Sequence, residues 1–227
     1  MGETDDPRDA ALRALARLKI FPLPSSVLIP GGYLPLHVFE PRYREMLTDC
    51  LASDRVLAVA TLAPGWETNY EGRPAVLPMM GVGYIESDEK LSNGRFNILL
   101  QGQLRVRMLS EHPATHAYRE IHAALVPDLL RPEDRDEVEA TSVTLRRLVL
   151  DLAAALPNTT ARPLARAAAS ERDESRLVDL VGAAVLSDAE QRQTFLEQTD
   201  VKRRLDMAID RVSQMLLQVS QPTGGEA

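Results

Sequence analysis

Cysteine, lysine, aromatic residues and long apolar runs are all scarce in this chain of 227 residues. A single cysteine excludes an internal disulfide, and nothing else in the composition calls for an oxidising compartment. No stretch approaches the roughly 18 consecutive apolar residues of a membrane-spanning helix. The N-terminus is acidic and polar, unlike the basic and then apolar start of an export signal. We therefore expect a cytoplasmic protein.

Positive charge is also in the minority, because the chain has a net charge of −7. Residues 1–130 contain 13 basic and 16 acidic side chains, and residues 131–227 contain 13 and 17. Both halves are thus acidic, which argues against a nucleic-acid-binding surface.

Sequence motifs of catalysis are missing as well. None of the lysines lies in the G-x-x-x-x-G-K-[ST] loop that cradles nucleotide phosphates, so we expect no ATPase activity. No G-x-S-x-G motif supplies a nucleophile that His37 could activate. We therefore expect a protein that is not an enzyme and that uses no cofactor.

The pattern from Ile20 to about Pro127 is mostly extended. Phe96, Ile98 and Leu100 alternate with residues of the opposite face, as in a strand with one buried side. This pattern predicts a small, strongly bent and mostly antiparallel β-barrel. Its strands are expected over residues 55–62, 75–86, 95–102, 103–109 and 118–126.

Two places in this region predict changes of chain direction. Asn93-Gly94 is typical of a tight primed hairpin turn, in which both residues have positive φ. Gly102 interrupts the extended pattern and indicates a bulge or a sharp bend.

The segment 21–43 precedes these strands and consists of two short extended stretches that meet at Gly31-Gly32. It leads into a helix predicted for residues 41–52, because Pro41 suits the first helical position, where its missing N–H costs nothing. Cys50 falls on the apolar face of this helix, so we expect a buried, unreactive thiol rather than a nucleophile.

Beyond Pro127 the apolar residues recur at helical spacing, and we expect about four helices. The first begins within residues 131–140 and ends at 157–163. The second follows Ser170 and Asp173, which resemble a capping box, and the third follows a better box at Ser187 and Glu190. The last helix, about residues 200–219, has a broad apolar stripe that fits a bundle, with a coiled-coil dimer as the alternative.

These patterns divide the chain into four parts. We expect a flexible tail over residues 1–15, a β subdomain over 16–127, a helical subdomain over 128–220 and a second flexible tail over 221–227.

Three segments together resemble the N-terminal substrate-binding domain of Lon proteases. They are FPLPSSVLIPGGYLPLHVFEPRY, which includes Pro30, Gly31, Phe39, Glu40, Arg42 and Tyr43; GVGYIESDEKLSNGRFNILLQGQLRVRML, which includes Asn93, Gly94, Gly102 and Arg105; and SDAEQRQTFLEQTDVKRRLDMAIDRVSQML. The resemblance implies an α+β fold: a bent antiparallel, PUA-like β-barrel with one inserted helix, followed by a C-terminal helical bundle.

The resemblance also implies a function. It points to non-catalytic recognition of unfolded or apolar polypeptide segments, without the ATPase and Ser-Lys protease domains of Lon. The partners would be unfolded or damaged polypeptides or a specific protein partner, with a protease system as a further candidate, and the chain would be a monomer or a weak dimer. The alternative is an adaptor or regulatory module that binds one protein or small-molecule partner; RNA binding is disfavoured by the acidic charge.

The most suggestive binding segment is the loop over residues 63–74, which holds Trp66 and Tyr70 in a Pro- and Gly-rich setting. Aromatic residues in loops are common anchors at interfaces. We predict a peptide-binding surface formed by Trp66, Tyr70, Tyr33 and Met80. The alternatives are that Trp66 caps one end of the barrel and that Met80 faces the core.

Two charged groups have both a structural and a functional interpretation. His112 and His116 have metal-ligand spacing for a helix, but Pro113 makes a helix unfavourable there, and we predict no metal site. Glu40 and Arg42, with the arginines at 105 and 107, predict an ion pair that fixes the helix to the barrel; the alternative is a clamp for a peptide terminus.

Overall fold

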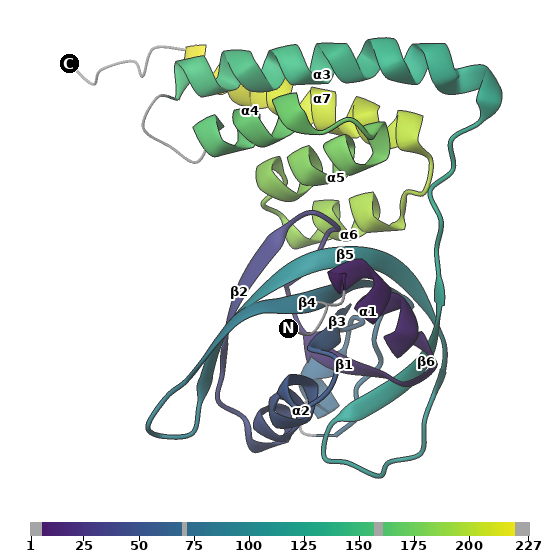
Figure 1. Ribbon diagram of the computed structural model, residues 1–227, viewed down its shortest axis with the longest axis vertical. Helices are drawn as coiled ribbons and strands as arrows, with labels where there is room; N and C mark the ends of the chain where they lie inside the picture. The colour runs from purple at the N-terminus through teal and green to yellow at the C-terminus, as the bar shows by residue number, and fades with distance from the viewer. Residues whose placement is uncertain (1–5, 70–71, 157–160, 221–227) are drawn as a thin grey trace. The chain divides into compact units, whose positions relative to one another are not determined.

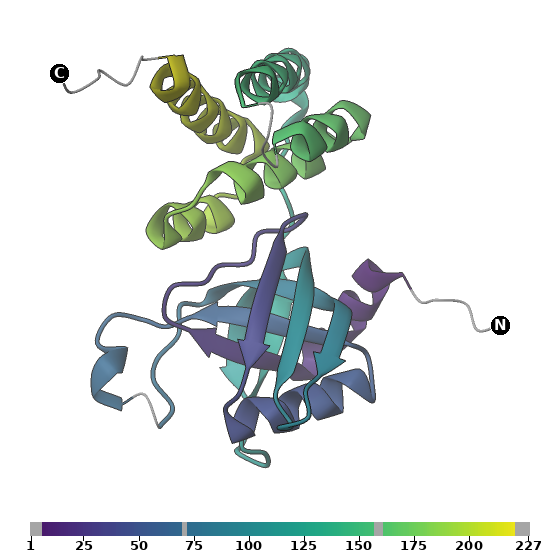
Figure 2. The ribbon, with the colours of Figure 1, turned by 90° about the vertical axis from the view of Figure 1, so that its left-hand side faces the viewer.

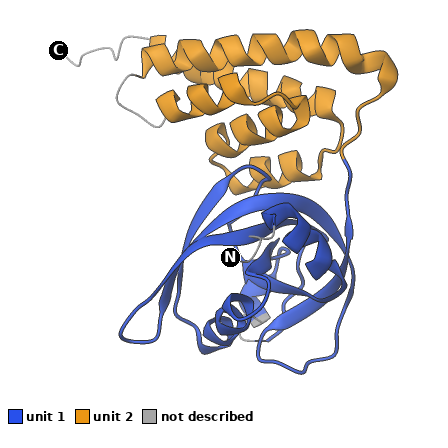
Figure 3. Cartoon of the chain, in the orientation of Figure 1, with its two compact units in different colours: residues 1–127 blue, residues 128–227 orange. Residues whose placement is uncertain are grey.

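The computed structural model describes residues 6–69, 72–156 and 161–220. The chain forms two compact units, residues 1–127 and residues 128–227 (Figure 3). Among the described helices, none has the length and apolarity needed to cross a bilayer.

Unit 1 is built around one six-stranded sheet with the strand order β2-β5-β4-β3-β1-β6 (Figure 1). A second pairing, between β5 and β6, closes the sheet into a ring. Only β1 and β3 run parallel, so the expected bent and mostly antiparallel sheet is confirmed. The strands are β1 Leu18–Leu23, β2 Tyr33–Val38, β3 Val56–Thr61, β4 Met79–Lys90, β5 Phe96–Glu111 and β6 Arg119–Leu125.

Strand β5 is continuous where the sequence predicted two strands, and it pairs with β2, β4 and β6. Gly102 pairs with Gly83 and Leu104 pairs with Val82, which leaves Gln103 as an extra residue. The bulge predicted at Gly102 is therefore confirmed. It bends β5 within the strand, and the ring can then close through the C-terminal half of β5.

The connection between β1 and β2 lies directly against the sheet. Its residues Leu28 and Ile29 are fully buried. A Cβ atom on Gly81 would lie 1.8 Å from the carbonyl oxygen of Leu28, and one on Gly102 would lie 2.2 Å from that of Ile29. Only glycine permits this close approach of backbone to backbone.

The hairpin between β4 and β5 is confirmed, but the type of turn predicted for it is wrong. Lys90 pairs with Phe96, and only Gly94 has a positive φ, of 76°. The Gly94 N–H donates to the carbonyl of Leu91 at 2.9 Å, and the Asn93 side chain accepts from the Arg95 N–H at 3.0 Å. Asn93 thus stabilises the turn through its side chain instead of adopting the left-handed conformation.

Two helices cover unit 1. Helix α1, Pro7–Ala14, occupies much of the expected N-terminal tail, so a flexible tail through residue 15 is wrong for these residues. Its alanines pack against the sheet, and the short 3₁₀ helix η1, Leu15–Arg17, leads into β1. Helix α2, Pro41–Leu51, confirms the predicted helix and packs against a second apolar cluster on a different side of the sheet (Figures 1 and 2).

Cys50 on α2 is fully buried, and its thiol donates to the carbonyl of Val56 at 3.3 Å. Burial raises the pKa of this thiol to about 12, an effect that Lys19 partly opposes and that Asp54 and Asp49 reinforce. We expect almost no reaction with a thiolate-specific disulfide reagent at pH 8, because the native thiolate fraction is on the order of 10⁻⁴. In urea the same chain should react fully; rapid native labelling would contradict this burial.

The raised pKa of Cys50 also predicts how the stability of the fold changes with pH. The neutral thiol is favoured by the fold, so this contribution is fully present below the unfolded pKa of about 8.5. It is lost as the pH rises from there towards the native pKa.

Unit 2 contains five α-helices among its described residues, where the sequence predicted about four. The missed helix is α4, which contains Pro163 in its first turn, where a missing N–H breaks no intrahelical bond. The predicted capping boxes are also displaced, since Asp173 caps α5 and Asp188 caps α6. The helices are α3 Arg135–Ala155, preceded by the 3₁₀ helix η3 Pro132–Asp134, then α4 Ala161–Ser170, α5 Glu174–Val185, α6 Ala189–Glu197 and α7 Val201–Ser220.

The core of unit 2 contains a charged network. Arg204 on α7 is fully buried and pairs with Asp179 on α5, which is 4% exposed. Its Nη2 also donates to Asp128 at 2.6 Å and to the Ser175 hydroxyl at 3.1 Å. Arg204 thus ties two helices and the start of the unit together.

Candidate functional site

The first candidate surface is the outer face of β2, formed by Tyr33, Pro35, His37 and the adjacent Phe39. These side chains are exposed, whereas the residues between them, which are at least partly buried, pack towards α2. Tyr33 is 55% exposed and Phe39 is 56% exposed. Among the described strands, β2 pairs with β5 alone, so it lies at an edge of the sheet (Figure 2). Large apolar groups therefore stand on an accessible edge strand.

Cross-strand hydrogen bonds hold the polar atoms of this face. Nδ1 of His37 lies 2.8 Å from Oδ1 of Asn97, whose amide nitrogen donates to Glu89 at 2.9 Å. Since the Asn97 oxygen can only accept, Nδ1 of His37 carries the proton in this bond. The His37 ring also stacks with Phe39 at a centroid distance of 6.2 Å. The face is therefore pre-organised instead of loosely ordered.

The predicted peptide-binding residues do not all lie at the surface. Tyr33 is exposed, and its hydroxyl accepts a hydrogen bond from Gln101 at 3.1 Å. Met80 is fully buried in the cluster beneath α1, so its assignment as a contact residue is wrong. Trp66, in the 3₁₀ helix η2 Trp66–Asn69, is partly buried against the same cluster, which favours the capping interpretation. Tyr70 lies outside the described residues.

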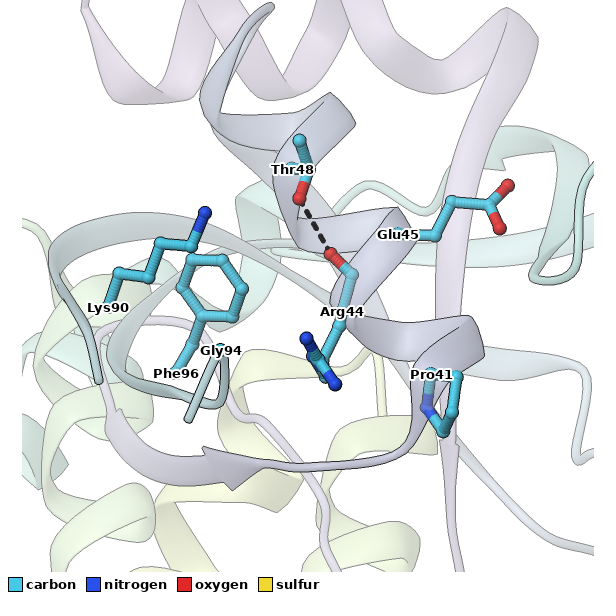
Figure 4. A pocket seen from close by; sticks show the side chains of 7 residues that line it. All are labelled: Pro41, Arg44, Glu45, Thr48, Lys90, Gly94 and Phe96. Atoms are coloured by element: carbon cyan, nitrogen blue, oxygen red, sulfur yellow. Dashed lines mark hydrogen bonds between the residues drawn. The ribbon is translucent and has the colours of Figure 1, made fainter. Parts of the chain in front are cut away.

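The second candidate is a pocket of about 300 Å³ between α2 and the β4–β5 turn, which we call the α2–hairpin pocket (Figure 4). Arg44 and Lys90 supply two cations, and the Nζ of Lys90 lies 5.6 Å from the centre of the Phe96 ring. Glu45 lines one side, but its carboxylate points away from Arg44 and Lys90 in Figure 4. The remaining lining residues are Pro41, Thr48 and Gly94.

The charged motif at the start of α2 forms a short-range ion pair. Oε2 of Glu40 lies 3.0 Å from Nε and 2.9 Å from Nη2 of Arg42. The Arg42 guanidinium also lies over the Tyr43 ring, 4.8 Å from its centre. Because two nitrogens of the guanidinium already bind Glu40, a clamp for a peptide terminus is disfavoured. The pair joins residues two apart in the sequence, so the predicted ion pair between helix and barrel stays a prediction. Arg105 is buried within β5.

One group of side chains could hold a metal ion. Glu45 and Asp49 on α2 and His116 before β6 each offer a ligand atom, and these atoms lie within 4.8 Å of one another. His112, whose spacing from His116 does not predict a metal site, is not part of this group, and its Nε2 lies 2.9 Å from the carbonyl oxygen of Ala16. Burial is the main cause of the raised pKa of Tyr118, and the hydrogen bond from its hydroxyl to Asp49, at 2.7 Å, adds to it. One of the three potential ligands is thus already engaged in a structural hydrogen bond, and we assign no metal to the group.

Unit 2 has a cavity of its own, of about 470 Å³, along α6 and α7. Its lining mixes carboxylates with apolar groups, and Arg211 there already donates to the carbonyl of Val185 at 3.1 Å. The other lining residues are Leu186, Asp188, Glu190, Gln191, Thr194, Met207, Asp210 and Gln214. Asp188 is committed to capping α6, so we assign no ligand to this cavity.

Known proteins with similar sequences are Lon proteases. The chain is 29% identical over 198 residues to Lon protease 2 of Myxococcus xanthus and 28% identical over 203 residues to a Lon protease of Anaeromyxobacter dehalogenans. These alignments cover 85% and 86% of this chain but 23% of each relative. The chain thus spans about a quarter of the length of these relatives.

Solved structures show the same fold. The N-terminal domain of a Mycobacterium avium complex Lon protease aligns with a TM-score of 0.66 at 21% identity, and covers 87% of this chain and 98% of that domain. A Lon N-terminal domain protein from Xanthomonas campestris aligns with a TM-score of 0.57 at 22% identity, over 86% of this chain and 97% of that one. The family model of the ATP-dependent protease La (LON) substrate-binding domain matches residues 17–214. The chain therefore belongs to the LON substrate-binding domain family.

Proposed function

We propose that this chain recognises apolar segments of unfolded polypeptides through the outer face of β2, and that it catalyses no reaction itself. The observation that carries the proposal is the pair of exposed rings at the two ends of an accessible edge strand, Tyr33 at the start of β2 and Phe39 directly after its end. Exposed aromatic groups in fixed positions provide contact area at a low cost in conformational entropy. Membership of the LON substrate-binding domain family supports a role in substrate recognition.

Recognition through side chains fits β2 better than addition of a strand to its free edge. Pro35 has no N–H group, and proline on an edge strand weakens the pairing of a further strand. Leu34 and Leu36 alternate with the exposed residues and pack on the opposite face, so they hold β2 in place without contributing to the outer face. Contacts through side chains tolerate many sequences, as binding of unfolded chains requires.

The expected affinity is modest. If each ring buries about 100 Å² of further apolar surface, at roughly 25 cal/mol per Å² the pair contributes about 5 kcal/mol. Ordering a flexible peptide opposes this gain. A free energy of about 5 kcal/mol corresponds to a dissociation constant of roughly 0.2 mM, so we expect binding in the high micromolar range or weaker.

We expect the double variant Tyr33→Ser, Phe39→Ser to weaken binding of fluorescein-labelled reduced casein at least about tenfold, which corresponds to about 1.4 kcal/mol. The reason is the loss of two exposed rings that support no core packing. Binding is measured by fluorescence anisotropy, and an unchanged circular dichroism spectrum would show that the fold is retained.

Leu109→Ser is the matched control, because Leu109 is also 56% exposed but lies on β5. An equal loss of affinity in this control would indicate unspecific binding to any exposed apolar side chain. Absence of saturable binding by the unchanged protein would contradict the proposal and favour an adaptor for one folded partner.

A further inference from the structure

The α2–hairpin pocket combines two cations with an aromatic floor. Within the described residues, neither Arg44 nor Lys90 forms an ion pair. The nearest acidic lining residue, Glu45, is turned away (Figure 4) and lies 3.5 Å from Nδ1 of His116. The chain is acidic as a whole, so this uncompensated positive pocket stands out against its surface charge.

Arg44 is held in the pocket by the shape of the turn opposite it. A Cβ atom on Gly94 would lie 2.3 Å from Nη2 of Arg44, so only glycine leaves room for the guanidinium. Nε of Arg44 is buried and has no hydrogen-bond partner among the described residues. A buried donor without an acceptor is unfavourable, and the charge of the guanidinium is left unneutralised by the protein. An anion in the pocket would relieve this electrostatic cost.

The lining selects among anions. A guanidinium presents a planar fork of donors that matches a carboxylate, and Lys90 adds a second point charge to the lining of the same pocket. Phe96 and Pro41 supply apolar surface next to the cations. A cavity of about 300 Å³ has room for one side chain or one chain end. These features fit a carboxylate that is carried beside apolar groups.

We propose that the α2–hairpin pocket binds the carboxylate of a polypeptide, from an acidic side chain or a C-terminus, and thereby favours apolar segments that carry a nearby negative charge. This inference rests on the proposed function, because it takes the ligand to be a polypeptide. In this proposal, the outer face of β2 binds apolar segments, and Arg44 and Lys90 favour those segments that also carry a carboxylate.

The test uses three fluorescein-labelled peptides with the same apolar sequence. One is neutral and amidated, one has an internal Asn→Asp change, and one has a free C-terminal carboxylate. We expect the protein to bind at least one acidic peptide about five- to tenfold more tightly than the neutral peptide, as for a partly exposed charge-assisted contact. Arg44→Gln and Lys90→Gln should each reduce this preference and leave the affinity for the neutral peptide unchanged.

Arg95→Gln is the matched control, because it removes one exposed positive charge from the same hairpin without changing the pocket lining. An unchanged preference in the Arg44 and Lys90 variants, or an equal loss in the Arg95 variant, would overturn the proposal. The proposal would also be overturned if the protein bound inorganic phosphate at constant ionic strength and showed no preference for either acidic peptide. The pocket would then be a site for a free oxyanion and not for a polypeptide carboxylate.

Failure of this proposal differs from failure of the proposed function. If the neutral peptide binds and the double variant on β2 loses it, while no charge preference exists, only the pocket assignment is wrong. If acidic peptides bind through Arg44 and the neutral peptide does not bind at all, the pocket assignment stands and the apolar role of β2 is wrong.

Discussion

Gly81→Ala should destabilise unit 1 by at least about 3 kcal/mol, at the upper end of the cost of overpacking. The new methyl group would lie 1.8 Å from the carbonyl oxygen and 2.7 Å from the carbonyl carbon of Leu28. Both atoms belong to the backbone of a buried connection. Relief of the overlap therefore requires a backbone shift, whereas a flexible side chain could change its rotamer. Urea unfolding followed through the fluorescence of Trp66, which packs against this core, measures the change in the free energy of unfolding.

Gly65→Ala separates steric overlap from the general effect of replacing a glycine. No atom lies within 4 Å of a Cβ on Gly65, although its φ of 88° makes an L-residue unfavourable there. This substitution should cost only about 1–2 kcal/mol. Equal losses for the two variants would contradict the close approach of the Leu28 backbone to Gly81.

Arg204→Met should destabilise unit 2 by about 3–5 kcal/mol, because it leaves the carboxylate of Asp179 buried without its counter-charge. Asp179 is 4% exposed, so water cannot replace the lost guanidinium. The measurement is a urea titration in which the loss of helix is monitored by circular dichroism. The variant should unfold at a lower urea concentration than the unchanged protein.

The double variant Arg204→Met, Asp179→Leu tests the cause. Replacing both charges by apolar groups also removes the buried carboxylate that has lost Arg204, so it should recover much of the lost stability. Arg203→Met is the control, since this neighbouring arginine is exposed. A double variant as unstable as the single one would show that packing of the Arg204 stem, and not the pairing of charges, is responsible.

The elements that the sequence predicts well have a strong local signal. Helix α2 follows from Pro41 and the spacing of its apolar residues, and the N-terminal half of β5 follows from its alternation, although the continuation of the strand through Gly102 does not. Helix α4 was missed because a proline inside a polar stretch looks like a helix end, while in the structure Pro163 lies in the first turn. Asn93 likewise has two ways to make a turn, and sequence alone does not choose between its side chain and its backbone.

The candidate sites depend on contacts that sequence does not reveal. Arg44 and Gly94 meet only because α2 lies against the β4–β5 turn, so neither residue has a sequence signal that points to the pocket. Alternation along a strand shows which residues share a face, but it does not show which face is buried. Met80 is therefore predicted at the surface, whereas the structure places it in the core. Tyr33 does carry a usable signal, because it alternates with the partly buried residues of a strand that contains proline, and Phe39 continues this alternation one residue beyond the strand.

Closure of the ring has a consequence for the order of folding. Leu18 of β1 pairs with Ile121 of β6, so residues from the two ends of unit 1 must meet. Such a fold has high contact order, and its loop-closure entropy must be overcome before the final pairing contributes. During synthesis, one edge of β1 and one edge of the C-terminal half of β5 stay unpaired until β6 has left the ribosome. A protein that we propose to bind unfolded chains thus itself passes through a partly folded state, in which it exposes surfaces like those of the chains that it binds.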